Sequence, residues 1–229
     1  MKRSYVFAGL ALVAAIGAGA FMVFKEWSPD RARYPVRGID VSRHQGVIDW
    51  TQVAKDDVAF AIMKATEGGD WVDPKFAENF KAAREQGLAV GAYHFYRLNK
   101  TGAEQARNFI ATVPDAPDLL PPVVDIEFSG NGPERPTPAE LRKEVDDFLA
   151  LVETAYGKPA IIYIIGEAEA AYGAAMPDRA RWVRSLVSHP GHENWAYWQY
   201  HNMGRVDGIE GDVDLNVLQG GVEQLQALR

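Results

Sequence analysis

The residues best suited to chemistry are two carboxylic acids, Asp125 and Glu127, which follow the apolar run at residues 121–124. In an extended strand, residues two positions apart face the same side, with Cα atoms about 6 to 7 Å apart. Two carboxyl groups held that close in a partly dry site do not titrate alike, so one can donate a proton while the other stays ionised. Hydrolysis of a glycosidic bond needs this division of labour. The same pair also fits a solvated strand end or a divalent-cation site.

Two further acids, Asp40 and Asp214, lie in the first and last predicted strands. Each of them alone is most often a cap or a turn acceptor. In a closed barrel, however, the first and last strands are neighbours, so these two carboxyl groups should approach each other. The sequence therefore predicts one site with four acids.

Short β-rich runs alternate with amphipathic stretches from residue 36 onward, a pattern typical of the α/β class with a parallel sheet and crossover helices. Thr137, Pro138 and Glu140 form a helix start of the capping-box type, and Gly157 ends that helix. Two more helices are predicted over residues 74–86 and 102–112. The predicted strands span residues 36–41, 59–66, 89–95, 123–127, 160–165, 181–186, 195–200 and 212–217.

Five of these strands are followed by helices and the last three lie close together, which indicates an irregular barrel. Barrels of this kind carry their chemistry at the carboxyl ends of the strands. Lys64 and Glu67, at one such end, are expected to form a supporting ion pair. The aromatic side chains at these ends suit either the core or a sugar-binding surface, and His44 suits either substrate binding or support of its loop. The candidates for substrate binding are His44, Tyr93, Tyr163, Trp198, Gln199 and Tyr200.

Composition and motifs exclude several classes of protein. The chain has 229 residues and no cysteine, so disulfides and thiolate metal sites are excluded. From residue 34 onward there are 19 basic and 29 acidic side chains, a net charge of −10, which argues against nucleic-acid binding. No phosphate-binding loop, dinucleotide fingerprint, serine-hydrolase elbow or metal-binding motif is present. We therefore expect carboxylate chemistry with no cofactor and no metal.

The amino-terminal segment is expected to enter a membrane. Residues 5–24 form an uncharged run of twenty, long enough to cover about 30 Å as a helix. Residues 1–25 are either an uncleaved anchor or a signal peptide cut after Ala18-Gly19-Ala20. Residues 26–35, with two prolines and mixed charge, are expected to be a linker. The rest of the chain would then lie outside the cytoplasm, anchored to the membrane or secreted.

With its motifs taken together, the body of the chain resembles the glycoside hydrolase 25 lysozymes, also called Chalaropsis-type muramidases. The match runs from about residue 38 to residue 220, and the order of its elements makes it specific. These elements are Gly38-Ile39-Asp40-Val41-Ser42, His44-Gln45-Gly46, Ile48-Asp49-Trp50, Lys64-Ala65-Thr66-Glu67-Gly68, Gly91-Ala92-Tyr93-His94-Phe95, Asp125-Ile126-Glu127, Trp198-Gln199-Tyr200 and Val213-Asp214-Leu215-Asn216.

The resemblance implies a TIM-like (β/α)5(β)3 barrel over residues 36–221, followed by a short tail at residues 222–229. It also implies hydrolysis of the β-1,4 bond between N-acetylmuramic acid and N-acetylglucosamine in peptidoglycan, by a monomer. Glu127 would be the general acid, and Asp125 would orient the substrate acetamido group, whose carbonyl oxygen acts as internal nucleophile. Asp40 and Asp214 would shape the site electrostatically. A direct inverting mechanism is the alternative for such sites.

Two other functions stay open at this stage. One is a glycan-binding barrel that has lost turnover, against which the intact Asp125 and Glu127 count. The other is a barrel glycosidase of a different amino-sugar polymer such as chitin, which lacks the lactyl ether of muramic acid.

Overall fold

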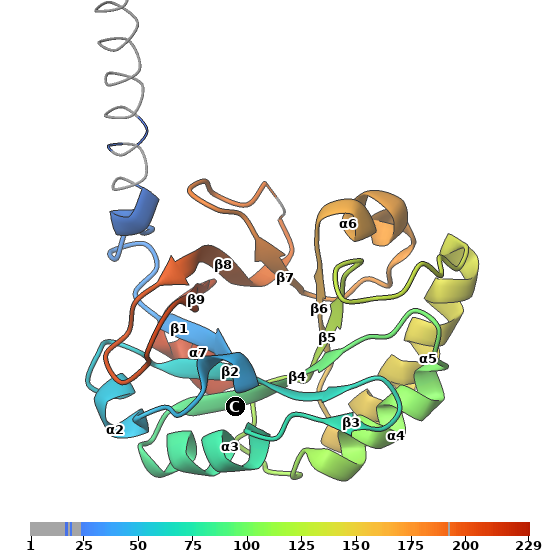
Figure 1. Ribbon diagram of the computed structural model, residues 1–229, viewed down its shortest axis with the longest axis horizontal. Helices are drawn as coiled ribbons and strands as arrows, with labels where there is room; N and C mark the ends of the chain where they lie inside the picture. Colours follow the sequence, from blue (N-terminus) through green and yellow to red (C-terminus); the bar gives the residue numbers. More distant parts are fainter. Residues whose placement is uncertain (1–16, 18, 20–23, 192) are drawn as a thin grey trace, which may run out of the picture.

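The computed structural model describes Gly17, Gly19 and residues 24–191 and 193–229. Eight strands close into a barrel (Figure 1). They are β1 (Arg37–Val41), β2 (Phe60–Glu67), β4 (Ala89–Phe95), β5 (Val123–Ile126), β6 (Ile161–Ile164), β7 (Arg181–Arg184), β8 (Trp195–Gly204) and β9 (Val213–Leu218). All eight overlap predicted strands, with β8 extending four residues beyond its predicted end, so the predicted α/β barrel is confirmed. A ninth strand that the sequence did not indicate, β3 (Trp71–Val72), pairs antiparallel with the end of β2.

Strand pairing explains why the barrel is irregular. Among the barrel strands β1, β2, β4, β5, β6, β7 and β8, each neighbouring pair is parallel. β9 runs antiparallel to both β8 and β1 and closes the barrel between them. Asp40 on β1 lies opposite Asp214 on β9 in this register. The expected approach of the first and last acids is therefore confirmed.

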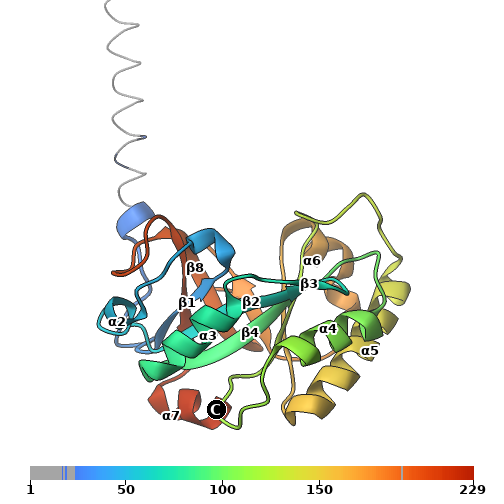
Figure 2. The same cartoon turned by 60° about the horizontal axis from the view of Figure 1, so that its bottom comes forward.

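Helices cover the outside of the barrel between its first six strands. They are α2 (Trp50–Val53), α3 (Phe76–Glu85), α4 (Gly102–Thr112), α5 (Pro138–Tyr156) and α6 (Gly166–Tyr172). Figure 2 shows α3, α4 and α5 along one side of the barrel. The capping box at the start of α5 is confirmed: the Glu140 amide donates to the Thr137 hydroxyl and the Glu140 carboxylate accepts from the Thr137 amide. Gly157 ends α5 in the left-handed conformation, with φ of 64°.

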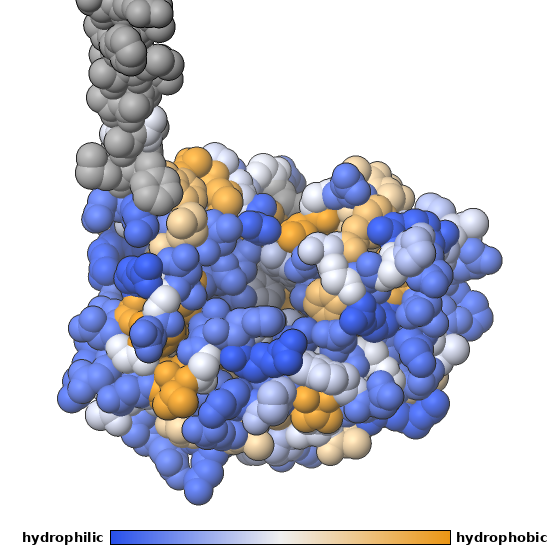
Figure 3. Space-filling view, in the orientation of Figure 1, coloured by the Kyte–Doolittle hydropathy of each residue, from blue (hydrophilic) through white to orange (hydrophobic). Residues whose placement is uncertain are grey.

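The hydrophobic residues form two layers, because side chains alternate between the two faces of each strand. On β2, Phe60 and Ile62 point into the barrel, where they belong to the same cluster as Trp182 and Tyr197. The intervening residues Ala61, Met63 and Ala65 belong to the outer cluster between the strands and helices. The face of the molecule seen in Figure 3 is mostly hydrophilic, with hydrophobic side chains in small separate groups. The inward-facing positions that do not belong to this inner hydrophobic cluster are available for the functional site.

Both flanking segments pack against the barrel. In the segment expected to be a linker, the rings of Trp27 and Tyr34 lie 6.0 and 5.5 Å from that of Trp198, on the outer face of β8. The segment expected to be a short tail forms the helix α7 (Val222–Leu228), whose Leu225 is buried with the inner cluster. The predicted anchor or signal lies almost entirely outside the described residues. Within the described part of the chain, no helix has the length and apolar character needed to cross a membrane.

The contact between α4 and α5 gives a stability prediction. A Cβ atom on Gly102 would lie 1.7 Å from the backbone carbonyl oxygen of Glu144, so Gly102→Ala forces the two helices apart. We expect the variant to lose about 2 kcal/mol of unfolding free energy, as overpacked sites do. Urea denaturation measures this, with Gly191→Ala as the matched control because its Cβ would meet nothing within 4 Å. Equal stability of the two variants would contradict this packing.

Candidate active site

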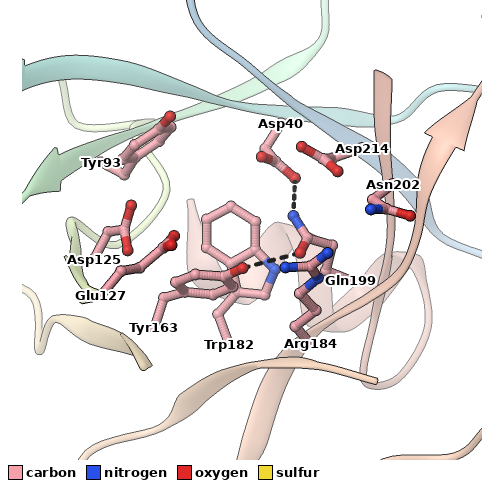
Figure 4. Close-up of a pocket in the computed structure, with 10 residues that line it drawn as sticks. All are labelled: Asp40, Tyr93, Asp125, Glu127, Tyr163, Trp182, Arg184, Gln199, Asn202 and Asp214. Atoms are coloured by element: carbon pink, nitrogen blue, oxygen red, sulfur yellow. Dashed lines mark hydrogen bonds between the residues drawn. The ribbon is translucent and has the colours of Figure 1, made fainter. Parts of the chain in front are cut away.

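All four predicted acids meet in one pocket at the carboxyl ends of the parallel strands. β1 supplies Asp40, the end of β5 supplies Asp125 and Glu127, and β9 supplies Asp214. Figure 4 shows these carboxyl groups around a common hollow. The complete lining is Asp40, Tyr93, Asp125, Glu127, Tyr163, Trp182, Arg184, Gln199, Asn202 and Asp214.

Asp125 and Glu127 differ in their exposure to solvent. Asp125 belongs to a fully buried strand and is 6% exposed, whereas Glu127 lies just beyond the strand end and is only half-buried. The backbone around them is fixed, because the Tyr96 amide donates to the Asp125 carbonyl and the Asn131 side chain donates to the Glu127 carbonyl, both at 2.8 Å. The buried Oδ1 of Asp125 accepts no hydrogen bond from any described residue. The Asp125 side chain nevertheless lines the pocket.

Asp40 is held by a network of amides and aromatic donors. Its Oδ2 accepts from Gln199 Nε2 at 3.0 Å and from Asn216 Nδ2 at 2.7 Å. Each amide is oriented in turn, since the Tyr163 hydroxyl donates to Gln199 Oε1 at 3.0 Å and Trp182 Nε1 donates to Asn216 Oδ1 at 2.8 Å. The network joins β1, β6, β7, β8 and β9 beneath the pocket, so Asp40 has one fixed orientation.

Burial raises the pKa of every acid in the pocket, and repulsion from neighbouring carboxylates raises it further for Asp40, Asp125 and Asp214. Burial is the largest cause for Asp125, whose pKa is also raised by the neighbouring charge of Glu127. The pKa of Glu127 is raised by burial and partly offset by its hydrogen bond with Asp125 and by the charges of Arg184 and Lys64. Burial likewise raises the pKa of Asp214, to about 6. Because charge is this costly here, protons stay bound at a pH where exposed carboxyl groups have lost theirs.

Asp40 has a raised pKa for the same reasons. Burial contributes most, the charge of Asp214 raises the pKa further, and the hydrogen bonds from Asn216 and Gln199 oppose both. The ionised form of Asp40 is thus the one that the amide network supports, while its surroundings disfavour a second negative charge beside it.

The expected ion pair between Lys64 and Glu67 is confirmed, with Nζ and Oε2 2.7 Å apart. Arg97 binds the other carboxylate oxygen of Glu67. Lys64 also lies over the rings of Trp71 and Phe95, at 5.1 and 4.5 Å. Its charge lowers the pKa of both Asp125 and Glu127, so this group supports the site electrostatically and does not line it.

The six candidates for substrate binding fall into two groups. Tyr93, Tyr163 and Gln199 line the pocket, whereas His44, Trp198 and Tyr200 do not. The assignment of Trp198 and Tyr200 to the site needs correction, because their neighbour Gln199 points into the barrel and alternation turns both of them outward. There they pack in a separate cluster with Tyr34. His44 is exposed in the 3-10 turn Arg43–Gln45, away from the pocket.

Three lining residues, Trp182, Arg184 and Asn202, were missed in the sequence. Trp182 and Arg184 lie two positions apart on β7, so strict alternation along that predicted strand would have placed both on one face. Asn202 gave no such signal, because the pairing of β8 with β9 shifts register between Gln199 and His201. No group of three or more metal-ligating side chains is found among the described residues.

A closed α/β barrel with four clustered acids at the carboxyl ends of its parallel strands is typical of the barrel glycoside hydrolases. The family model "Glycosyl hydrolases family 25" matches residues 39–209, most of the barrel, and the chain therefore belongs to this family. The chain is thus a glycoside hydrolase.

Individual relatives agree with this assignment. The chain is 41% identical over 208 residues to the protein YegX of Escherichia coli K12, covering 86% of this chain and 74% of that one. It is 32% identical over 208 residues to Lysozyme M1 of Streptomyces globisporus, covering 84% and 71%. Its structure is similar to a family 25 glycosyl hydrolase from Bacillus anthracis, with a TM-score of 0.78, 36% identity, and coverage of 85% and 94%.

The raised pKa of Asp214 predicts a pH-dependent stability difference. In the unfolded chain this carboxyl ionises near its ordinary pKa, whereas in the folded protein it ionises at about 6. Stability is therefore lost as the pH rises through this interval, and Asp214→Asn removes that loss. We expect the variant to be more stable than the wild type by about 2 kcal/mol at pH 8, and by much less at pH 4.

Urea denaturation at the two pH values measures this difference. Glu210→Gln, at an exposed carboxyl of the loop before β9, is the control and should show no comparable change. An equal effect of Asp214→Asn at pH 4 and pH 8 would contradict the raised pKa.

Proposed function

We propose that the protein is a lysozyme of the N-acetylmuramidase type, which hydrolyses the β-1,4 bond between N-acetylmuramic acid and N-acetylglucosamine in peptidoglycan. The observation that carries this proposal is the placement of Asp125 and Glu127 side by side, with raised pKa values, in a family 25 pocket. The similarity to Lysozyme M1 supports the choice of substrate.

Glu127 is the proton donor in this proposal. It is the more accessible of the two acids, and its raised pKa keeps the proton available until it passes to the glycosidic oxygen as the bond to C1 breaks. Lys64 and Arg184 limit the rise in its pKa, so the group can also lose that proton readily. A donor poised in this way matches the general acid of glycoside hydrolysis.

Asp125 orients the acetamido group of the sugar in this proposal. Its carboxylate lines the pocket and accepts the N–H of the acetamido group, which directs the carbonyl oxygen of that group toward C1. This oxygen forms the new bond to C1 while the leaving sugar takes the proton of Glu127, giving an oxazolinium ion. Water, deprotonated by Glu127, then opens that ion, and two displacements at C1 retain its configuration.

The other lining residues hold the sugar and the developing charge. Asp40 and Asp214 lie across the pocket, where the negative charge that this pair carries favours the cationic transition state. Tyr163 and Trp182, whose ring centroids are 4.9 Å apart, form an aromatic wall against which a sugar ring can lie. Gln199 is fixed by Tyr163 and can contact a hydroxyl group of the sugar while it holds Asp40.

The place of action follows from the substrate. We propose that the barrel works as a monomer outside the cytoplasm, anchored by residues 1–25 or released from them, because peptidoglycan lies on that side of the membrane. The uncharged run at residues 5–24 supports this proposal.

Digestion of purified peptidoglycan by the full chain tests the proposed function. We expect new reducing ends of muramic acid, detected by mass analysis, and a fall of about 10²- to 10⁴-fold in their rate of release for Glu127→Gln. Glu223→Gln, in α7 at the opposite end of the barrel, is the matched control and should keep full activity.

Three outcomes would contradict the proposal. Undiminished release of muramic-acid reducing ends by Glu127→Gln would contradict the assignment of Glu127 as the general acid. Binding of peptidoglycan without any release indicates a glycan-binding barrel, and cleavage of plain N-acetylglucosamine polymers alone indicates a chitinase.

A further inference from the structure

Arg184 is a cation in an otherwise acidic pocket, and the described residues give it no ion-pair partner. It is exposed at the end of β7, and no hydrogen bond or ion pair joins its guanidinium to any residue that the structure describes. Other arginines near strand ends are paired, such as Arg97 with Glu67 and Arg205 with Asp212. The five N–H donors of Arg184 are thus left for solvent or a ligand.

None of the acids in the pocket forms an ion pair with the guanidinium of Arg184. Arg184 is near enough to lower the pKa values of Glu127 and Asp214, yet neither carboxylate lies within ion-pair distance of it. Asp40 is already held by two amides. The arginine therefore acts on these carboxyl groups through space. Its N–H donors stay free to bind a ligand.

Its place beside the aromatic wall directs these donors toward a bound sugar. Trp182, two residues earlier on β7, is fixed by its hydrogen bond to Asn216, which fixes the strand that carries Arg184. In Figure 4, Tyr163 and Trp182 lie between Glu127 and Arg184. A sugar ring on this wall, with its reacting bond at Glu127, presents a substituent of its far side to Arg184.

We propose that Arg184 binds a carboxylate of the glycan and thereby selects strands that carry muramic acid. This inference rests on the proposed function, since it names the substrate group that the same pocket recognises. Guanidinium and carboxylate match as a planar, bidentate pair. A carboxylate entering a pocket with four acids is otherwise repelled, so an unpaired cation is what an anionic substrate needs there.

Two parts of peptidoglycan carry this chemistry. The lactyl group of muramic acid ends in a free carboxylate wherever the strand has lost its stem peptide. Where the peptide is present, the lactyl group is an amide and the carboxylates belong to the peptide. N-acetylglucosamine carries neither group.

Matched substrates separate carboxylate binding from a purely electrostatic role. We would measure kcat/KM of wild type, Arg184→Gln and Arg184→Lys on peptide-free glycan strands, on the same strands with each lactyl group converted to its methylamide, and on intact peptidoglycan. Arg184→Gln should lose about 10- to 100-fold on a carboxylate substrate and less than about 3-fold on the methylamide. Arg184→Lys should recover part of the loss, and Arg107→Gln, on the outer surface of α4, should lose nothing.

The pattern of losses also identifies the source of the carboxylate. A loss on peptide-free strands places the lactyl carboxylate at Arg184, and a loss confined to intact peptidoglycan places a stem-peptide carboxylate there. An equal loss on all three substrates overturns the inference, because a residue that only tunes the acids affects every substrate alike.

A binding measurement keeps this test distinct from the proposed function. Calorimetry of Glu127→Gln with the peptide-free strands and with intact peptidoglycan, each with and without Arg184→Gln, reports recognition without cleavage. Weaker binding of either substrate in the double variant supports the inference even if the wild type proves inactive. Unchanged binding of both substrates, together with equal kinetic losses, refutes it while leaving the lysozyme activity intact.

Discussion

The cost of placing four carboxyl groups in one partly dry pocket governs the rest of the site. Burial alone disfavours each negative charge, and every additional charge raises the cost of the next. The protein meets this cost with different means at each acid. Two amides bind Asp40, Lys64 acts through space on Asp125, and Lys64 and Arg184 both act on Glu127. Asp214 keeps its proton up to a pH of about 6. The four acids are consequently unequal, and general acid catalysis depends on that inequality.

Barrel closure makes this arrangement structurally possible. The antiparallel strand β9 brings Asp214 opposite Asp40 on β1, while β5 presents its two acids across the same mouth. The network beneath Asp40 runs through side chains of five strands, so the acids share one rigid floor. Outside the strands, α4 and α5 approach closely at Gly102 and hold that side of the barrel.

Sequence patterns were sufficient for the strands and for the four acids, because alternation and strand ends are local properties that a single chain displays. They were insufficient where a strand departs from regular geometry. Trp198 and Tyr200 resembled site residues by type, yet the inward orientation of Gln199 turns both toward the docked segment that includes Tyr34. Asn202 enters the pocket only because the register of β8 shifts before it. Arg184 could have been predicted from the alternation of side chains along β7, which places it on the same face as Trp182.

Carbon-detected NMR titration of the side-chain carboxyl groups between pH 3 and pH 9 tests whether Asp125 and Glu127 form an unequal pair that retains a proton. We expect two separate titration steps shared by the pair, with the later one clearly above the ordinary range of about 4 for exposed carboxyl groups. A single step for both residues within that ordinary range would contradict it.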